Sequence, residues 1–215
     1  MLPVERVFFR TRLERARFIA ARLPGYITGK VLDVGCDEAH LKSLLSLQDY
    51  VGIDVCGQPD LLLNLERIDR LPFADSSFDC VICCEVLEHL DNLYVIFAEL
   101  VRVSRRHLIV SLPNNWGNAR RPIARGRGSI GHYGLPLQSP PDRHKWFFAL
   151  SEAKHFLESK ASENKLKVLE AFATEKPRNG LVSALRRLRY PDQLAYLNRY
   201  AHTYWTVLEK PQPCG

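Results

Sequence analysis

The sequence predicts an α/β fold in which helices cover both faces of a doubly wound, mostly parallel sheet. Short apolar segments typical of buried strands alternate with segments whose apolar residues recur at helical spacing. The first apolar segment ends in a glycine turn that leads into a helix, a junction at which such sheets bind ligands. The composition, 46% hydrophobic and 25% charged, is typical of a globular protein and excludes a disordered chain.

Strands and helices follow one another along the chain. Among the expected helices, residues 91–101 begin at Asp91, a good N-cap, and residues 1–27 form a helical cap with one apolar stripe. Further helices are expected at residues 38–47, 152–159 and 181–189. Seven strands are expected, at residues 30–34, 50–54, 60–65, 78–84, 107–112, 168–174 and 202–209.

The length of 215 residues fits a single domain, residues 1–215, with two insertions. Residues 113–150 are expected to be an irregular substrate-side insertion, because residues 113–141 are rich in Pro, Gly, Arg and Asn and have no periodicity. Residues 180–198 are expected to be a helical insertion before the last strand. The longest apolar run, residues 93–98, is too short to span a membrane.

Charge is unevenly distributed. The formal net charge is +6, but residues 1–27 carry +4, residues 28–100 carry −10 and residues 101–215 carry +12. Residues 101–141 contain seven arginines and no acid. A cationic ligand is therefore expected on the middle segment and an anionic partner on the last one.

The cysteines indicate free thiols rather than a metal site. Cys80 and Cys83 have a metal-like spacing, but residues three apart on a strand point to opposite faces of the sheet. We identify no metal-ligating set in the sequence. Six cysteines without a disulfide pattern favour a reducing compartment, and we expect a cytoplasmic protein.

The turn after the first strand indicates which ligand binds there. Asp54 ends the second strand 21 residues after Asp33, a spacing at which an acid can bind ribose hydroxyls. Asp37 and Glu38 stand where a dinucleotide's pyrophosphate would lie, and no phosphate-binding Gly-Lys-Ser/Thr loop is present. A ring of acids suits instead S-adenosylmethionine (SAM), a nucleoside with a cationic sulfonium and no phosphate. Glu85 completes this ring.

Over about residues 28–115 the sequence resembles class I SAM-dependent methyltransferases, in particular the UbiE-like and MetW-like enzymes of the methyltransferase type 11 group. The strings Leu71-Pro-Phe-Ala-Asp-Ser-Ser-Phe-Asp79 and Cys84-Glu-Val-Leu-Glu-His-Leu90 carry most of the resemblance, and Ile109-Val-Ser-Leu-Pro-Asn114 looks like the end of the family's fifth strand. The resemblance implies a Rossmann-like methyltransferase fold with a seven-stranded sheet whose last strand is antiparallel. It also implies SAM as cofactor and S-adenosylhomocysteine as product.

The resemblance also assigns cofactor-binding residues. Asp33 and Gly35 would face the methionine part, Asp54 the ribose, and Val55, Asn64 and Leu65 the adenine, while Cys84 and Glu85 would close the pocket. Cys36 and Asp37 lie in the same turn. The family's second and third turn glycines are replaced by Asp37 and Ala39, and an acid near the adenine by Asn64. Asp tolerates a left-handed backbone and Ala is small, so we expect the turn to survive.

Methyl transfer requires a nucleophile aligned with the sulfonium methyl, and a general base only where the acceptor keeps a proton. We find no catalytic triad. The substrate-side candidates for catalysis are His89, which could equally pack locally, His132 and His144. The candidates for substrate binding are Asn114, Arg121, Tyr133 and Trp146.

The expected function is transfer of the SAM methyl group to an O, N or C nucleophile of a small-molecule or lipid-precursor acceptor, anionic because of the arginines at 120, 121, 125 and 127. One alternative is a non-catalytic protein of the same fold that binds an anionic partner. The other is an RNA methyltransferase, which is less favoured because residues 118–130 offer no aromatic side chain for stacking on bases.

Overall fold

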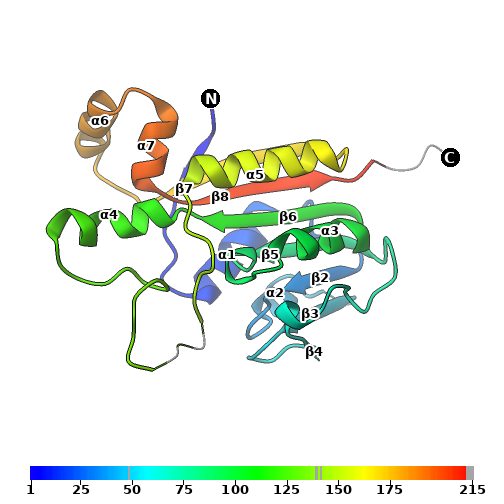
Figure 1. Ribbon diagram of the computed structural model, residues 1–215. Coiled ribbons are helices and arrows are strands. Elements are labelled where there is room, and N and C mark those ends of the chain that lie inside the picture. The colour runs from blue at the N-terminus through cyan, green and yellow to red at the C-terminus, as the bar shows by residue number, and fades with distance from the viewer. Residues whose placement is uncertain (48, 139, 141, 212–215) are drawn as a thin grey trace.

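Eight strands form one sheet in the computed structural model, which describes residues 1–47, 49–138, 140 and 142–211 (Figure 1). The strand order is β1-β7-β8-β6-β5-β2-β3-β4. Only β8 runs antiparallel to its neighbours in this described part of the sheet, as expected for the last strand. The strands are β1 Val4–Arg6, β2 Val31–Val34, β3 Tyr50–Asp54, β4 Leu61–Leu62, β5 Phe78–Cys84, β6 Ser104–Pro113, β7 Lys167–Glu175 and β8 Ala201–Glu209.

Helices cover both faces of the sheet. One face carries α1 (Arg12–Arg22) and α2 (His40–Leu44), and the other carries α3 (Leu93–Val103) and α5 (Leu150–Glu163). Helices α4 (Asn115–Arg125), α6 (Gly180–Arg189) and α7 (Gln193–Tyr200) lie together at one end of the sheet (Figure 1). Two 3₁₀ turns, Leu65–Arg67 and Leu87–His89, follow β4 and β5.

Alternation along the strands separates the core into two layers. Trp205 packs with α1 and α2, whereas its neighbour Tyr204 packs with α3 and α5. Cys80 and Cys83 are divided between the two layers in the same way, as the sequence predicts. Both faces are buried because a central strand of a doubly wound sheet is covered on each side, so its sequence is almost continuously apolar.

Two expectations need correction. The expected seven strands are eight, because residues 4–6 of the predicted helical cap add the edge strand β1 beside β7. Residues 115–125, expected to be irregular, form helix α4. Its N-cap is Asn114, whose Oδ1 accepts from the Gly117 N–H, and Gly126 ends it in a left-handed conformation (φ 61°). The proline in its last turn and its few apolar residues hid this helix from a search for periodicity. The signals that could have revealed it are the Asn114 N-cap and the Gly126 C-cap.

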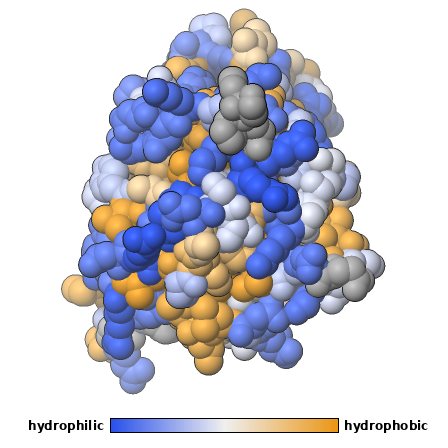
Figure 2. All heavy atoms as spheres, turned by 90° about the vertical axis from the view of Figure 1, so that its right-hand side faces the viewer, coloured by the Kyte–Doolittle hydropathy of each residue, from blue (hydrophilic) through white to orange (hydrophobic). Residues whose placement is uncertain are grey.

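The parallel strands point their carboxyl ends toward α4 and α7, and ligands of α/β sheets bind at that edge. Figure 2 shows the opposite end of the molecule, where mostly hydrophilic residues surround scattered hydrophobic ones. Within the described ranges, no helix is both long and apolar enough to cross a bilayer.

Candidate active site

The turn between β2 and α2 keeps a glycine-type backbone despite its substitutions. Gly35 has a φ of 77°, and a Cβ there would lie 2.3 Å from Cγ2 of Val86. Asp37 and Ala39, the residues that replace the family's glycines, have φ angles of 52° and 50°. The expected turn therefore forms, with two L-residues in the left-handed region that usually favours glycine.

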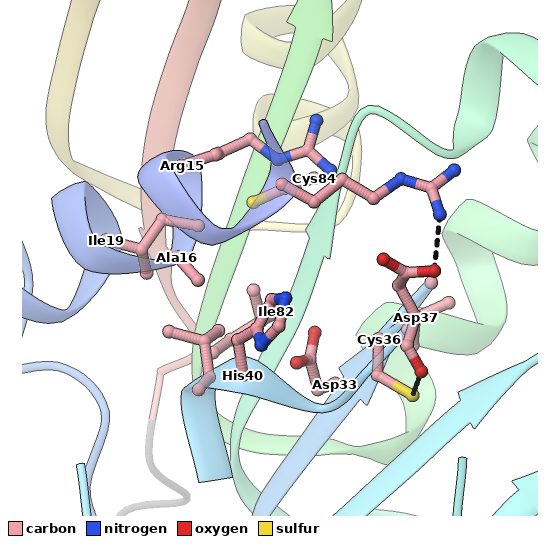
Figure 3. A pocket seen from close by; sticks show the side chains of 13 residues that line it. Arg15, Ala16, Ile19, Asp33, Cys36, Asp37, His40, Ile82 and Cys84 are labelled. Atoms are coloured by element: carbon pink, nitrogen blue, oxygen red, sulfur yellow. Dashed lines mark hydrogen bonds and ion pairs between the residues drawn. The ribbon is translucent and has the colours of Figure 1, made fainter. Parts of the chain in front are cut away.

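Beside this turn lies a small cavity of about 40 Å³ (Figure 3). Asp33, at the end of β2, points into it and is 6% exposed. The Tyr50 hydroxyl donates to Oδ2 of Asp33 at 2.7 Å. Burial raises the pKa of Asp33 to about 6, an effect that the Tyr50 hydrogen bond and Arg15 oppose and that Asp54 adds to. Asp33 is therefore mostly ionised at neutral pH. The cavity is lined also by the predicted residues Gly35, Cys36, Asp37 and Cys84.

Asp54 closes the neighbouring strand β3 and holds the turn. Its carboxylate accepts from the backbone N–H groups of Asp37 (2.9 Å) and Val55 (2.6 Å). Among the other predicted cofactor residues, Val55 is 60% exposed, while Leu65 belongs to the core. Asn64 caps the first 3₁₀ turn by accepting from the Glu66 N–H at 3.0 Å. These residues and Glu85 are not among those that line the cavity.

Helix α1 brings two arginines to the site that sequence reasoning did not assign to it. Arg12 pairs with Asp37 at 2.5 Å, and Arg15 pairs with Glu85, which also accepts from the Thr203 hydroxyl at 2.7 Å. The two arginines of α1 thus partly neutralise the acids of the predicted ring (Figure 3). The available signal was the +4 charge of residues 1–27 next to a −10 segment.

The two cavity thiols are not nucleophiles at neutral pH. Burial raises the pKa of Cys36 to about 12, and the nearby Asp33 and Asp54 add to this. Burial likewise raises the pKa of Cys84 to about 12. Neither thiol is ionised under physiological conditions, and the thiolate is the reactive form.

The three predicted histidines converge next to this cavity, although they are distant in sequence. His144 lies between the other two, with ring centroids 4.5 Å from both His89 and His132. Glu88, buried in the second 3₁₀ turn, adds a carboxylate 3.8 Å from Nε2 of His89. Burial, together with the neighbouring His89 and His132, lowers the pKa of His144 to about 3, so the ring is neutral.

Backbone and side-chain contacts hold the loop segment that carries His144. The Lys145 N–H donates to the carbonyl of Glu88 at 2.8 Å, and the Lys145 ammonium pairs with Asp91 at 2.8 Å. The indole N–H of Trp146 donates to the carbonyl of Leu90 at 2.8 Å. The segment is therefore fastened to the chain that follows β5.

The predicted substrate-binding residues have different surroundings. Asn114 is fully buried, and its amide donates to the carbonyls of Leu197, Asn198 and Ala201, so its role is structural. Trp146 is partly buried and packs against the hydrophobic core. Tyr133 borders the histidines, with its ring centroid 5.3 Å from that of His144, and Arg121 lies exposed on α4. Of this set, Arg121 is exposed, Tyr133 and Trp146 are partly buried, and Asn114 alone is fully buried.

A second, larger cavity of about 590 Å³ lies between α4 and α7. Its wall combines the apolar side chains of Trp116, Ile123 and Phe147 with Arg120 and Arg199. This cavity begins close to the histidines, because the ring of Phe147 contacts that of Tyr133 at 4.9 Å and Tyr133 contacts His144.

Comparisons with known proteins agree with the fold and the site. The family described as "Methyltransferase domain" matches residues 32–110, which include β2, the glycine turn, β5 and most of β6. No curated protein sequence matches the chain significantly.

Solved structures share the fold at low sequence identity. The methyltransferase domain of a bacterial Hen1 is 19% identical over 92% of this chain and 97% of its own, with a TM-score of 0.59. The small RNA methyltransferase HEN1 is 16% identical over 98% of this chain and 27% of its own, with a TM-score of 0.62.

Magnesium protoporphyrin IX methyltransferase from Synechocystis PCC 6803, solved with bound S-adenosylhomocysteine, is 16% identical over 93% of this chain and 83% of its own, with a TM-score of 0.56. The cofactor of such methyltransferases is SAM, and the residues at the glycine turn fit it. A side chain at Gly35 would clash with Val86, and the turn presents carboxylates and no phosphate-binding loop. Residues 32–110 therefore match a methyltransferase domain, and the whole chain has the fold of SAM-dependent methyltransferases.

Proposed function

We propose that the protein transfers the methyl group of SAM to an anionic acceptor with a large apolar part, such as a lipid-linked molecule. The observation that carries this proposal is the cavity between α4 and α7, which is large enough for a drug-sized ligand and combines apolar walls with arginines. It begins next to the histidines beside the cofactor turn, so a molecule bound there would reach the transferable methyl.

Among the residues that the structure describes, Arg120 and Arg199 of this cavity form no ion pair with a carboxylate. Arg120 stands close to Arg199, and its pKa is lowered by burial and by that second guanidinium. Nε of Arg199 is buried and makes no hydrogen bond with any described residue. Two guanidinium groups that contact tyrosine rings rather than carboxylates, beside apolar walls, favour an anionic head group attached to an apolar chain.

The exposed surface of α6 supports an acceptor located at a lipid surface. Leu181, Leu185 and Leu188 recur at spacings of four and three, and are 70%, 58% and 81% exposed. Exposed arginines 187 and 189 lie on the same helix. An apolar helix face with a basic rim is typical of helices that lie in an anionic membrane interface.

In the cofactor site we propose roles for residues on two elements. Asp33 would accept from the ammonium group of SAM, and Asp54 from its ribose hydroxyls. Arg15, largely buried over the cavity, would exchange Glu85 for the cofactor's carboxylate. Bound SAM supplies an electrophilic methyl group, and the chain's own task is to align the acceptor with it, an effect worth up to about 7–11 kcal/mol.

The acceptor class is tested by following tritium from methyl-labelled SAM into fractions of a cell extract from the protein's own source. We expect label in the organic-extractable anionic fraction, none with Asp33→Ala, and much less with Arg199→Met. Arg70→Met, an exposed arginine outside the cavity lining, is the matched control and should keep full labelling. Label confined to RNA, or to small molecules without an apolar group, would contradict the proposal.

A further inference from the structure

Three ligand-type side chains meet beside the cofactor site. The donor atoms of Glu88, His89 and His144 all lie within 4.8 Å of one another. Metal–ligand bonds of about 2.0–2.2 Å allow ligands up to about 4.4 Å apart, so a shift of a few tenths of an ångström would let all three bind one ion. Two imidazoles and one carboxylate form a donor set that suits divalent transition metals and leaves positions open.

The carboxylate of Glu88 points to a cation independently of this geometry. Glu88 is 1% exposed, and its Oε2 has no hydrogen-bond partner among the described residues. A buried carboxylate oxygen without a hydrogen-bond partner is costly, and a bound cation is one of the few groups that compensate for it.

The residues around His89 hold its ring as outer-shell groups hold a metal-binding histidine. Nδ1 of His89 lies 2.6 Å from Asp142 and 3.3 Å from the carbonyl of Arg143, so it carries the proton and leaves Nε2 bare toward Glu88. The Asn115 amide N–H donates to Nδ1 of His144 at 3.1 Å, because its Oδ1 accepts from the Phe148 N–H at 3.2 Å. His144 therefore binds a metal through Nε2 only after Asn115 turns its amide oxygen toward Nδ1. The Asp142–His89 pair is a carboxylate–histidine pair of the kind that orients the ring and raises ligand basicity.

We propose that Glu88, His89 and His144 bind a divalent transition-metal ion, whose open positions hold an oxygen atom of the acceptor beside the SAM methyl. The binding site stands by itself, whereas the role at the acceptor rests on the proposed function. In that role the acceptor is a hydroxyl compound. The metal lowers the pKa of its hydroxyl, whose proton passes to water. The acceptor oxygen then forms a bond to the methyl carbon as the S–CH₃ bond breaks. The electron pair of the broken S–CH₃ bond stays on sulfur.

Metal binding is tested on the chelator-stripped full chain without any acceptor. Mn²⁺ is followed by the loss of its free-ion electron paramagnetic resonance signal, and Co²⁺ by its visible absorption. We expect one equivalent bound, and affinity lower by at least about tenfold in Glu88→Gln and His144→Ala. His155→Ala, an exposed histidine on α5, should bind as the wild type does.

Circular dichroism and S-adenosylhomocysteine affinity show whether each variant is folded, and His89→Ala provides a third variant should one not fold. Absence of binding at millimolar metal, or binding that survives these substitutions, would overturn the site. Methyl transfer then tests the role. We expect chelation to abolish transfer and Mn²⁺ to restore it, with S-adenosylhomocysteine affinity unchanged. Transfer that is insensitive to chelation would overturn the role and leave the acceptor proposal standing.

Discussion

Single residues decide how the cofactor turn keeps its shape. Gly35 cannot be replaced without displacing Val86, whereas Asp37 and Ala39 take up left-handed conformations that glycine would adopt at lower energy. The substitutions were visible in the sequence, and so was the tolerance of Asp and Ala for this backbone. The turn was therefore predictable, and its strain is a property of individual residues that stability measurements can detect.

Replacing Ala39 by glycine should stabilise the protein. Ala39 has a φ of 50° at the start of α2, and left-handed backbone costs an L-residue about 1–2 kcal/mol. We expect Ala39→Gly to raise the free energy of unfolding by about 1 kcal/mol after the greater entropy of glycine in the unfolded chain is subtracted. Urea denaturation measures the change. The control Ala98→Gly, exposed on helix α3, should lower stability by about 1 kcal/mol.

Asp33 should destabilise the fold in a pH-dependent way. Because its pKa rises from 3.8 in the unfolded chain to about 6 in the fold, its ionised form opposes folding. The penalty is present in full above about pH 6 and absent below pH 3.8. We expect Asp33→Asn to be more stable than the wild type by up to about 3 kcal/mol at pH 8 and by about half of that at pH 5.

Urea denaturation at both pH values checks this prediction, and cofactor affinity should fall in the same variant. A stability difference that does not change between pH 5 and pH 8 would show that Asp33 titrates as it does in the unfolded chain. Function accounts for keeping a destabilising carboxylate, since the proposed partner is the cofactor's ammonium group.

Among the elements, helix α1 has the largest effect on the site. The predicted N-terminal helix is present, but periodicity indicated only that its apolar stripe would be buried. That Arg12 and Arg15 lie over the cofactor turn depends on how α1 packs beside α2. The cavity of about 40 Å³ beneath them is far smaller than the roughly 300–1,000 Å³ of ordinary ligand sites, so SAM requires these side chains to move.

Cofactor binding should therefore be visible in α1. At S-adenosylhomocysteine concentrations about 100-fold above its dissociation constant, any opening of α1 that releases the ligand becomes about 100-fold rarer. We expect hydrogen–deuterium exchange to slow in residues 12–22, while α5 on the other face of the sheet keeps its rates. Unchanged exchange in α1 would show that the cofactor enters without it, and Arg15→Met should remove the effect by weakening binding.

The whole molecule separates a cofactor region from a basic, partly apolar region. The segment of residues 28–100, with a charge of −10, contains the cofactor turn, and each of α4, α6 and α7 carries arginines of the +12 segment. In Figure 1 these three helices extend beyond the carboxyl ends of the strands. This places the apolar face of α6 and the larger cavity on the same end of the molecule as the site.

If α6 contacts lipid, the protein should bind vesicles that contain anionic phospholipid and bind neutral ones weakly. Removing Leu185 and Leu188 from the interface by Leu→Glu substitution should lower vesicle affinity by at least about tenfold, because each buried leucine is worth about 1.5–3 kcal/mol. The matched control Val95→Glu, on an exposed position of α3, should bind normally. Co-sedimentation measures the difference, and equal binding by all three proteins would exclude α6 as the contact.

The sequence by itself determined the alternation of strands and helices, the glycine turn with Asp33 and Asp54, and the resemblance to SAM-dependent methyltransferases. These features are local, because they follow from side-chain periodicity and from backbone conformations within a few residues. Only the tertiary structure decided that Arg15 meets Glu85, 70 positions away, and that His144 joins Glu88 and His89. Such meetings depend on the path of helices and loops across the sheet, which no short-range pattern records.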